Sequence, residues 1–149
     1  NYLGYIEEAF LAYRTERYNI KGKDVIAGNC KYYLNDLSFK NFLYPGFSYG
    51  VGYLLENAVY LELRQSGYSV YVGAIRDKEV DFVAMKDDRV IYLQTTYMLE
   101  TEQTIEREYS PLLSIKDNYE KYVVSVDEIQ LPSKEGIRNI QVWNLNEIL

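Results

Sequence analysis

The chain has 149 residues, of which 48% are hydrophobic and 26% charged, so its composition is that of a soluble globular domain and not of a disordered or collagen-like chain. Its 16 basic and 22 acidic side chains give a net charge of −6, which argues against coating nucleic acid by overall attraction. Histidine is absent, which excludes mechanisms that need an imidazole, and the single cysteine excludes an internal disulfide and favours a reducing cytoplasm.

The chain is predicted to begin with a short acidic helix followed by a basic hairpin. Apolar residues at helical spacing predict the helix over residues 2–10. Residues 11–14 and 17–20 are predicted as two strands joined by the two residues between them. Four basic side chains give this hairpin a local positive charge: Arg14, Arg17, Lys21 and Lys23. Such a hairpin is either a sheet edge kept polar against aggregation or the wing that ends a winged-helix module.

A change of charge marks a predicted domain boundary between residues 48 and 49. A strand is predicted over residues 31–34 and a helix over residues 37–43, which a Pro-Gly pair ends. Residues 1–48 carry 6 basic and 5 acidic side chains, whereas residues 49–149 carry 10 and 17. The first segment is too short to form an independent core.

The larger segment is predicted to form a mixed sheet with helices packed on it. Helices are expected over residues 51–65 and 102–115, and a terminal turn or helix over residues 145–149. Five runs rich in Val, Ile, Tyr and Thr are expected to be strands: residues 69–72, 79–85, 89–97, 119–126 and 140–143. The resulting order, α-β-β-β-α-β-β, predicts an α/β (α+β) fold with a mixed central sheet flanked by helices.

The sequence lacks the motifs of a nucleotide-binding loop, a membrane span and a signal peptide. No Gly-rich phosphate loop occurs, so we expect no ATP site in this chain. No apolar run approaches the ~18 residues of a membrane span, and the start lacks the pattern of a signal peptide. We therefore expect a cytoplasmic protein with no membrane partner. Because the chain begins at Asn1 and not at Met, we also expect it to be part of a longer protein.

The hairpin around residues 87–88 is predicted to bring polar side chains together. A two-residue loop there makes paired positions sum to 175. Asp81 then lies opposite Gln94. Glu79 likewise lies opposite Thr96, and alternation places all four side chains on one face of the sheet. The opposite face is expected to be core and carries the alternate residues Val80, Phe82 and Ala84. A polar cluster at one end of an otherwise apolar face is a candidate site.

Glu56 is the second unusual carboxylate, because it lies among apolar positions on the predicted helix of residues 51–65. A carboxylate on such a flank needs a partner. If this helix packs over the hairpin, Glu56 meets Asp81 and Gln94 around one divalent ion, since Mg²⁺ and Mn²⁺ prefer oxygen ligands. The alternative is that Glu56 bonds an Arg or Tyr inside the protein and has no further role.

Eight segments of the chain together carry a family resemblance: N-Y-L-G-Y-I-E-E-A-F at 1–10, K-Y-Y-L-N-D at 31–36, L-L-E-N-A-V-Y-L-E-L at 54–63, G-Y-S-V-Y-V-G at 67–73, K-E-V-D-F-V-A at 78–84, I-Y-L-Q-T-T-Y at 91–97, E-R-E-Y-S-P-L-L-S-I-K-D-N-Y at 106–119 and K-Y-V-V-S at 121–125. With these segments almost the whole chain resembles the C-terminal domain appended to prokaryotic AAA-type ATPases, which is assigned to the PD-(D/E)XK nuclease superfamily. The resemblance implies a restriction-endonuclease-like αβββαβ core over residues 49–149.

The resemblance also implies a set of catalytic roles. In that superfamily a helix glutamate, an aspartate of the second strand and an acid-x-lysine motif of the third form the metal and water site. By position these roles fall to Glu56, Asp81, Gln94 and Thr96. Gln94 replaces a carboxylate, and Thr96 replaces the lysine that would orient or activate the attacking water. Lys78 is the nearest alternative lysine. The implied site is an impaired catalytic motif in which Glu56, Asp81 and Gln94 would hold Mg²⁺ or Mn²⁺.

The resemblance finally implies that an ATPase module and a winged-helix segment precede this domain in the full protein. Residues 1–23 then correspond to the tail of the winged helix, and the four basic side chains of its wing become candidate phosphate contacts. Three functions are compatible with these observations. They are a DNA-associated accessory domain with a nuclease-like fold, an active Mg²⁺- or Mn²⁺-dependent nuclease with a rearranged lysine, and a protein-interaction or homo-oligomerisation module with a vestigial pocket.

Overall fold

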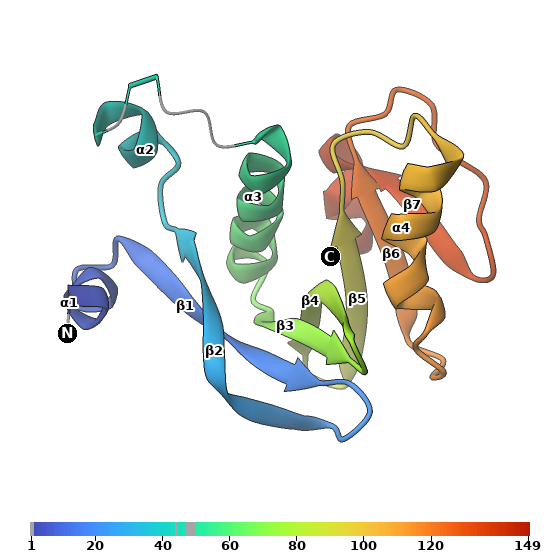
Figure 1. Ribbon diagram of the computed structural model, residues 1–149, viewed down its shortest axis with the longest axis horizontal. Helices are drawn as coiled ribbons and strands as arrows, with labels where there is room; N and C mark the ends of the chain where they lie inside the picture. Colours follow the sequence, from blue (N-terminus) through green and yellow to red (C-terminus); the bar gives the residue numbers. More distant parts are fainter. Residues whose placement is uncertain (1, 44, 47–49) are drawn as a thin grey trace.

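The computed structural model describes residues 2–43, 45–46 and 50–149. Over these residues it contains one sheet of seven strands, in the order β2-β1-β3-β4-β5-β6-β7 (Figure 1). The strands are β1 Ala12–Asn19, β2 Asp24–Leu34, β3 Ser69–Ile75, β4 Lys78–Lys86, β5 Arg89–Thr95, β6 Glu120–Ser125 and β7 Ile137–Gln141. The helices are α1 Tyr2–Glu8, α2 Ser38–Leu43, α3 Val51–Gln65, α4 Glu102–Leu113 and the 3-10 helix η1 Val142–Ile148.

The sheet is mixed, as predicted. β1 pairs antiparallel with β2 and parallel with β3. β3, β4 and β5 form an antiparallel meander, and β6 and β7 then follow in parallel. The order α3, β3, β4, β5, α4, β6 reproduces the expected αβββαβ core, so the predicted fold class is confirmed. Among the described residues, no helix is long and apolar enough to cross a membrane.

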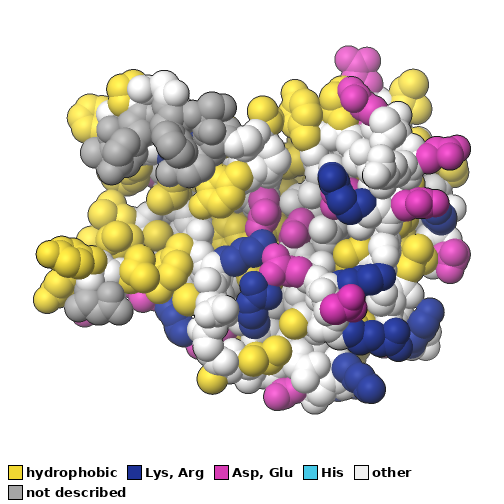
Figure 2. All heavy atoms as spheres, in the orientation of Figure 1, with side chains coloured by type: hydrophobic (Ala, Val, Ile, Leu, Met, Phe, Trp, Pro, Cys, Tyr) yellow, Lys and Arg dark blue, Asp and Glu magenta, His cyan; other side chains and the backbone are white. Residues whose placement is uncertain are grey.

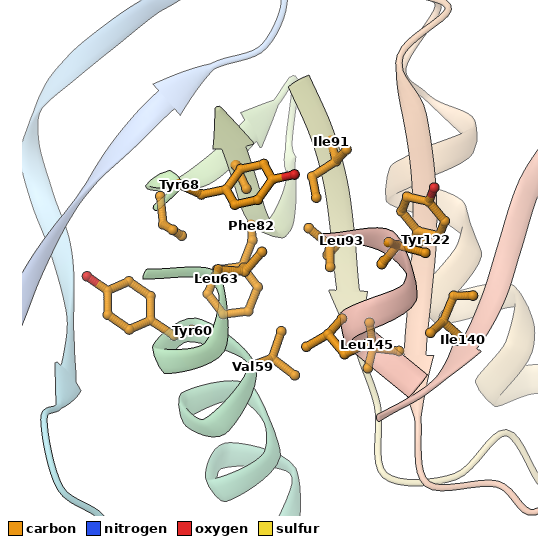
Figure 3. Close-up of a cluster of buried hydrophobic side chains, with 14 of the residues drawn as sticks. Val59, Tyr60, Leu63, Tyr68, Phe82, Ile91, Leu93, Tyr122, Ile140 and Leu145 are labelled. Carbon is orange, nitrogen blue, oxygen red and sulfur yellow. The ribbon is translucent and has the colours of Figure 1, made fainter. Parts of the chain in front are cut away.

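Two apolar layers hold helices on opposite faces of this sheet. Under α3 the core is built largely from aromatic and aliphatic side chains, among them Val59, Tyr60, Leu63, Phe82, Leu93 and Tyr122 (Figure 3). Under α4 a second layer contains Val80, Val83, Tyr92, Tyr109, Leu112 and Val123. Consecutive strand residues fall in different layers because strand side chains alternate. Each fully buried large side chain contributes roughly 1.5–3 kcal/mol, so both helices are firmly attached.

A buried amide ties α3 to the end of β2. Asn57 is fully buried on α3, where an unpaired amide would destabilise the fold. Its Oδ1 accepts a hydrogen bond of 2.8 Å from the backbone N–H of Leu34, and its Nδ2 donates one of 2.9 Å to the carbonyl oxygen of the same residue. The pair fixes how the N-terminal hairpin meets α3, and the residues of β2 just before Leu34 therefore reach the side of α3 that carries Glu56.

The N-terminal hairpin turns at a different place from the one predicted. The turn was expected at residues 15–16, but β1 runs through them and the chain reverses at residues 20–23. Thr15 is 1% exposed and lies inside the ladder, where a register shift separates it from Arg17. The observed turn forms because Asn19 Oδ1 accepts from the N–H of Gly22 at 3.0 Å, a contact that favours Asn in turns.

The segments on either side of the predicted domain boundary share one sheet. The boundary itself, between residues 48 and 49, lies outside the described residues. β1 nevertheless pairs with β3 through Arg17–Val72 and two further pairs, so the hairpin extends the sheet of the larger segment. The hairpin thereby lies beside the strands that carry the candidate site.

Candidate functional site

β4 contains one extra residue relative to β3. The two strands pair at Tyr71–Val83 and again at Gly73–Val80, so a step of two residues along β3 matches a step of three along β4. This is a β-bulge, which interrupts alternation and re-aims a side chain. Glycine is required opposite it, because a Cβ on Gly73 would lie 2.9 Å from the Val80 Cβ and 3.0 Å from a Val83 methyl group. The bulge and Gly73 therefore belong together.

The bulge turns Asp81 toward the face that α3 covers. Val80 and Val83 both pack under α4, whereas Phe82 packs under α3. The prediction that Val80 and Phe82 share one core face was therefore wrong, because the extra residue lies between them. Asp81 Oδ2 accepts hydrogen bonds of 2.8 Å from both the backbone N–H and the Oγ1 of Thr95. The carboxylate is nearly buried at the end of β5, close to α3.

Gln94 does not share the face of the Asp81 carboxylate. The predicted register is confirmed up to the pair Phe82–Leu93, and the ladder then ends. Beyond it, Gln94 Oε1 accepts from the backbone N–H of Asp81 at 3.2 Å, and its Nε2 donates to Glu108 of α4 at 3.2 Å. The prediction that these four polar side chains point the same way was wrong. Gln94 instead joins the edge of β4 to α4.

Thr96 is neutral, and Lys78 does not reach the carboxylates, so neither residue supplies the positive charge of the expected site. Thr96 is buried, and its backbone N–H donates to the carbonyl oxygen of Val124 at 3.0 Å. The amino group of Lys78 donates to Ser110 Oγ at 2.5 Å and to Ser114 Oγ at 3.2 Å, at the end of α4. Lys78 is therefore held against α4, so the prediction that it is the alternative lysine of the site was wrong.

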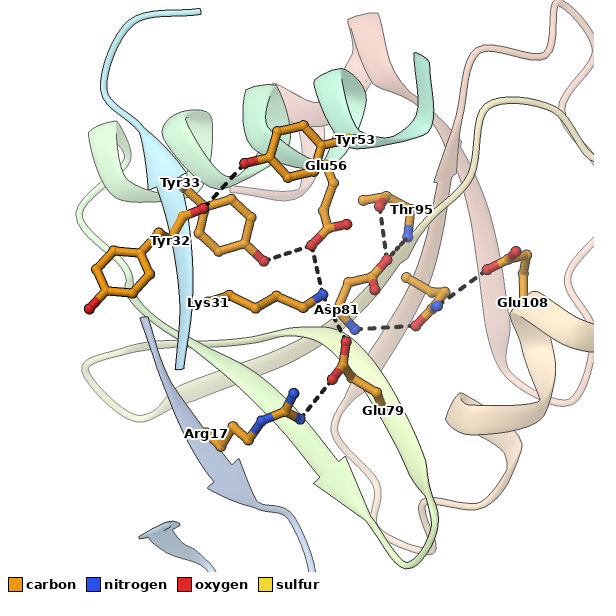
Figure 4. A network of polar contacts seen from close by, with 11 residues as sticks. Arg17, Lys31, Tyr32, Tyr33, Tyr53, Glu56, Glu79, Asp81, Thr95 and Glu108 are labelled. Carbon is orange, nitrogen blue, oxygen red and sulfur yellow. Dashed lines mark hydrogen bonds and ion pairs between the residues drawn. The ribbon is translucent and has the colours of Figure 1, made fainter. Parts of the chain in front are cut away.

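The cation of the site is Lys31, which the sequence analysis did not select. From β2, Lys31 Nζ lies 3.0 Å from Glu56 Oε1 and 2.7 Å from Glu79 Oε1 (Figure 4). Tyr33 donates its hydroxyl to the same Glu56 oxygen at 2.7 Å. Residues 31 and 33 share a strand face, so β2 delivers an ammonium group and a hydroxyl together. Two facts in the sequence could have pointed to Lys31. Glu56 needed a partner, and strand alternation places Lys31 and Tyr33 on the same face.

The basic side chains of the hairpin have different partners. Arg17 forms an ion pair of 2.7 Å with Glu79, and Arg14 pairs at 3.1 Å with an acidic residue of its own strand. Lys21 and Lys23 lie at the exposed β1–β2 turn and form no ion pair with any described residue. The four residues predicted to contact nucleic acid thus fall into two neutralised arginines and two uncompensated lysines.

Burial and charge set opposite protonation tendencies within the cluster. Burial, and then the negative charge of Glu56, raise the pKa of Asp81 to about 7. Burial alone would also raise the pKa of Glu79, but Lys31 and Arg17 outweigh it and hold that pKa below its ordinary value. Burial would lower the pKa of Lys31, but its contacts with Glu79 and Glu56 outweigh burial and raise that pKa. Glu79 and Lys31 are therefore charged at neutral pH, while Asp81 is partly protonated.

A polar pocket of about 720 Å³ opens beside Glu56 and Asp81, between α3, the end of β5 and the start of α4. Glu56, Asp81 and Gln94 line it, together with Arg107 at its exposed mouth. Arg107 is ion-paired at 2.7 Å with the adjacent, buried Glu108. The pocket lies where the sequence analysis expected a site. Its side chains Glu56, Asp81 and Gln94 already have ion-pair or hydrogen-bond partners within the protein.

The predicted metal ligands do not fit a divalent ion in this arrangement. Glu56 is bonded by Lys31, the Asp81 carboxylate by Thr95, and the Gln94 carbonyl by a backbone N–H. Over the described residues, no group of three His, Cys, Asp or Glu side chains is placed to hold a metal. At Glu56 Oε1 a metal would compete with the Lys31 ammonium group and the Tyr33 hydroxyl. No catalytic step through a metal follows from this geometry.

Comparison with known proteins gives a relative but no activity. The chain is 36% identical over 141 residues to an uncharacterized protein of Haemophilus influenzae. The aligned region is 95% of this chain and 34% of that relative, so the chain spans about a third of the relative's length. No family model matches the sequence, and no solved structure matches it. The function must therefore be inferred from the geometry of the pocket.

Proposed function

We propose that this chain is a non-catalytic accessory domain with a nuclease-like fold, in which an internal lysine takes the position of a catalytic cation. The observation that carries the proposal is the ammonium group of Lys31, 3.0 Å from Glu56 and 2.7 Å from Glu79. A lysine held between two carboxylates supplies the positive charge that a divalent ion would otherwise supply. The domain accordingly lacks efficient phosphodiester hydrolysis.

The charge balance of the cluster supports this proposal. Three carboxylates, Glu56, Glu79 and Asp81, face the two cations Lys31 and Arg17. The raised pKa of Asp81 removes part of the remaining negative charge near neutral pH. Little net attraction is left for a dication, and the lysine that would activate water is replaced by a neutral threonine.

We further infer that the domain follows an ATPase module in a longer cytoplasmic protein. The family resemblance and the greater length of the Haemophilus relative support this inference. A second support is the apolar surface at the α1 and α2 end of the domain, visible in yellow in Figure 2. Its most exposed side chains are Tyr2, Tyr5, Phe10 and Phe42. Exposed apolar groups gathered in this way mark contact surfaces, and we assign this one to the ATPase module.

A cleavage assay with a matched variant tests the loss of catalysis. Fluorescent duplex DNA is incubated with the chain or with its Asp81→Ala variant, in Mg²⁺ and separately in Mn²⁺. We expect no cleavage above background and no difference between the two proteins. Cleavage that the Asp81→Ala substitution abolishes would overturn the proposal. If Lys31→Ala abolished it as well, Lys31 would be the rearranged lysine of an active nuclease.

A further inference from the structure

Two grooves meet at the C-terminal end of α4, away from the pocket of Glu56 and Asp81. Their volumes are about 500 and 270 Å³, and Arg76, Ser114 and Lys116 line both, so they form one continuous depression. The β1–β2 turn, the β3–β4 turn and the segment before β7 complete its walls. The depression shares no lining residue with the pocket of Glu56 and Asp81.

The depression concentrates uncompensated positive charge. Six basic side chains line it: Lys21, Lys23, Arg76, Lys78, Lys116 and Lys134. None of the six forms an ion pair with a described residue, whereas at least seven basic residues elsewhere in the described part of the chain do. Three acidic residues also line it, and one of these, Asp117, is already paired with Lys121. A local excess of cations on a protein of net charge −6 calls for an external anion.

Neutral groups hold several of these cations in place. Lys78 donates to the hydroxyl groups of Ser110 and Ser114. The Lys134 ammonium lies 6.0 Å from the centre of the Tyr109 ring, and Lys116 donates to a backbone carbonyl oxygen at 3.1 Å. Such contacts orient a side chain without cancelling its charge. Figure 2 shows Lys and Arg side chains gathered around the lower end of α4.

We propose that this depression binds the phosphate backbone of a nucleic acid. The cations follow two adjoining grooves and do not converge on one point, which matches a ligand with repeated phosphates better than a single phosphate group. Lysine and arginine contacts of this kind position a strand without reading its sequence. The surface is separate from the Lys31 cluster, so the inference does not depend on the loss of catalysis. It also reassigns Lys21 and Lys23 from a wing shared with Arg14 and Arg17 to this depression.

Fluorescence anisotropy with labelled single-stranded and duplex DNA tests the proposal. The Arg76→Ala/Lys116→Ala variant removes two exposed charges from the depression. The Arg64→Ala/Lys86→Ala variant removes two exposed charges elsewhere and is the matched control. We expect the first variant to bind DNA at least about tenfold more weakly at low salt, with a salt dependence reduced by about two phosphate contacts. The control should change affinity less than about twofold.

Other results would overturn the proposal. Equal weakening in both variants would mean attraction by overall charge alone. Absence of DNA binding by the unaltered chain, or binding that depends on Arg14 and Arg17 instead, would also contradict it. So would retention on phosphatidylserine vesicles that only the Arg76→Ala/Lys116→Ala variant loses, because the depression would then be a lipid-binding surface. Circular dichroism of both variants checks that they are folded, and the DNA cleavage assay remains a separate readout.

Discussion

Lys31 Nζ lies 3.0 Å from Glu56 Oε1, although the two residues come from β2 and α3 and are 25 positions apart. The contact joins the N-terminal hairpin to the helix that carries the expected catalytic glutamate. Glu79 of β4 shares the same ammonium group at 2.7 Å. One lysine thus connects three elements, so its removal should affect both stability and the affinity of the pocket for cations.

Replacing Lys31 should convert the cluster into a cation site. The Lys31→Met substitution leaves Glu56 and Glu79 without their shared partner, and we expect the free energy of unfolding to fall by about 2–3 kcal/mol. Mg²⁺ or Mn²⁺ should then raise the melting temperature of the variant but not of the unaltered protein, because a ligand that binds only the folded state stabilises it. Thermal unfolding with and without each metal measures both effects.

The matched control for this experiment is Lys86→Met, which removes an exposed lysine outside the cluster. It should leave both the stability and the response to metal nearly unchanged. Equal stabilisation by Mg²⁺ of the unaltered protein and of the Lys31→Met variant would show that Lys31 does not occupy the cation position.

The protonation of Asp81 predicts a stability that falls as the pH rises. Its pKa is about 7 in the folded protein, against an ordinary value of about 3.9. Between these values the folded state binds a proton that the unfolded state has lost, so stability declines from about pH 4 to about pH 7. The Asp81→Asn variant cannot ionise. We expect it to be more stable than the unaltered protein at pH 8, by up to about 4 kcal/mol, and to lose this advantage near pH 4.

Urea unfolding at several pH values measures the difference. Glu79 affects the pH dependence of stability in the opposite direction, because its pKa is lowered in the folded protein. Its contribution to stability is lost as the pH falls below the ordinary pKa of a glutamate. That contribution is common to both proteins and cancels in the comparison. A stability difference that does not vary with pH would contradict the assignment of the titrating group to Asp81.

The apolar surface at α1 should matter to the full-length protein more than to this domain. No described residue of α1 is buried, and Tyr5 and Phe10 are strongly exposed. The Tyr5→Ser/Phe10→Ser variant should therefore change the stability of the isolated chain by less than about 0.5 kcal/mol. In the full-length protein we expect faster proteolysis between this domain and the proposed ATPase module. If the isolated chain is dimeric and the variant monomeric, a second copy and not the ATPase module covers this surface.

Local patterns predicted α3 and the β4–β5 register correctly, but only residues 31–34 of β2 were expected to be a strand, and β7 begins at residue 137 and not at residue 140. α3 begins and ends where its periodicity indicated. The two-residue loop correctly predicted every β4–β5 pair from Lys86–Arg89 to Phe82–Leu93. These features depend on neighbouring residues only. The hairpin turn was misplaced because Thr15 is polar and yet fully buried, so its residue type suggested a turn where the strand continues.

The candidate site was only half predictable, because its geometry depends on contacts between distant segments. The roles of Glu56 and Asp81 as neighbouring carboxylates followed from helix and strand patterns. The direction of the Asp81 side chain did not, since it depends on a bulge that arises in the pairing of β4 with β3. Lys31 was missed for a similar reason: its approach to Glu56 depends on how β2 packs against α3.

Gly73 should be essential to that bulge. A Cβ at this position would approach Val80 and Val83 of β4 and the end of the Ile20 side chain at 2.9–3.0 Å. We expect Gly73→Ala to lower the free energy of unfolding by about 1–3 kcal/mol, whereas Gly52→Ala, where space is open, should be neutral or stabilising. Because the bulge turns Asp81 toward α3, Gly73→Ala should also weaken the fall of stability between pH 4 and pH 7. Urea unfolding of both variants across this range provides the measurement. Lower stability with an unchanged pH dependence would show that Gly73 only relieves crowding and does not position Asp81.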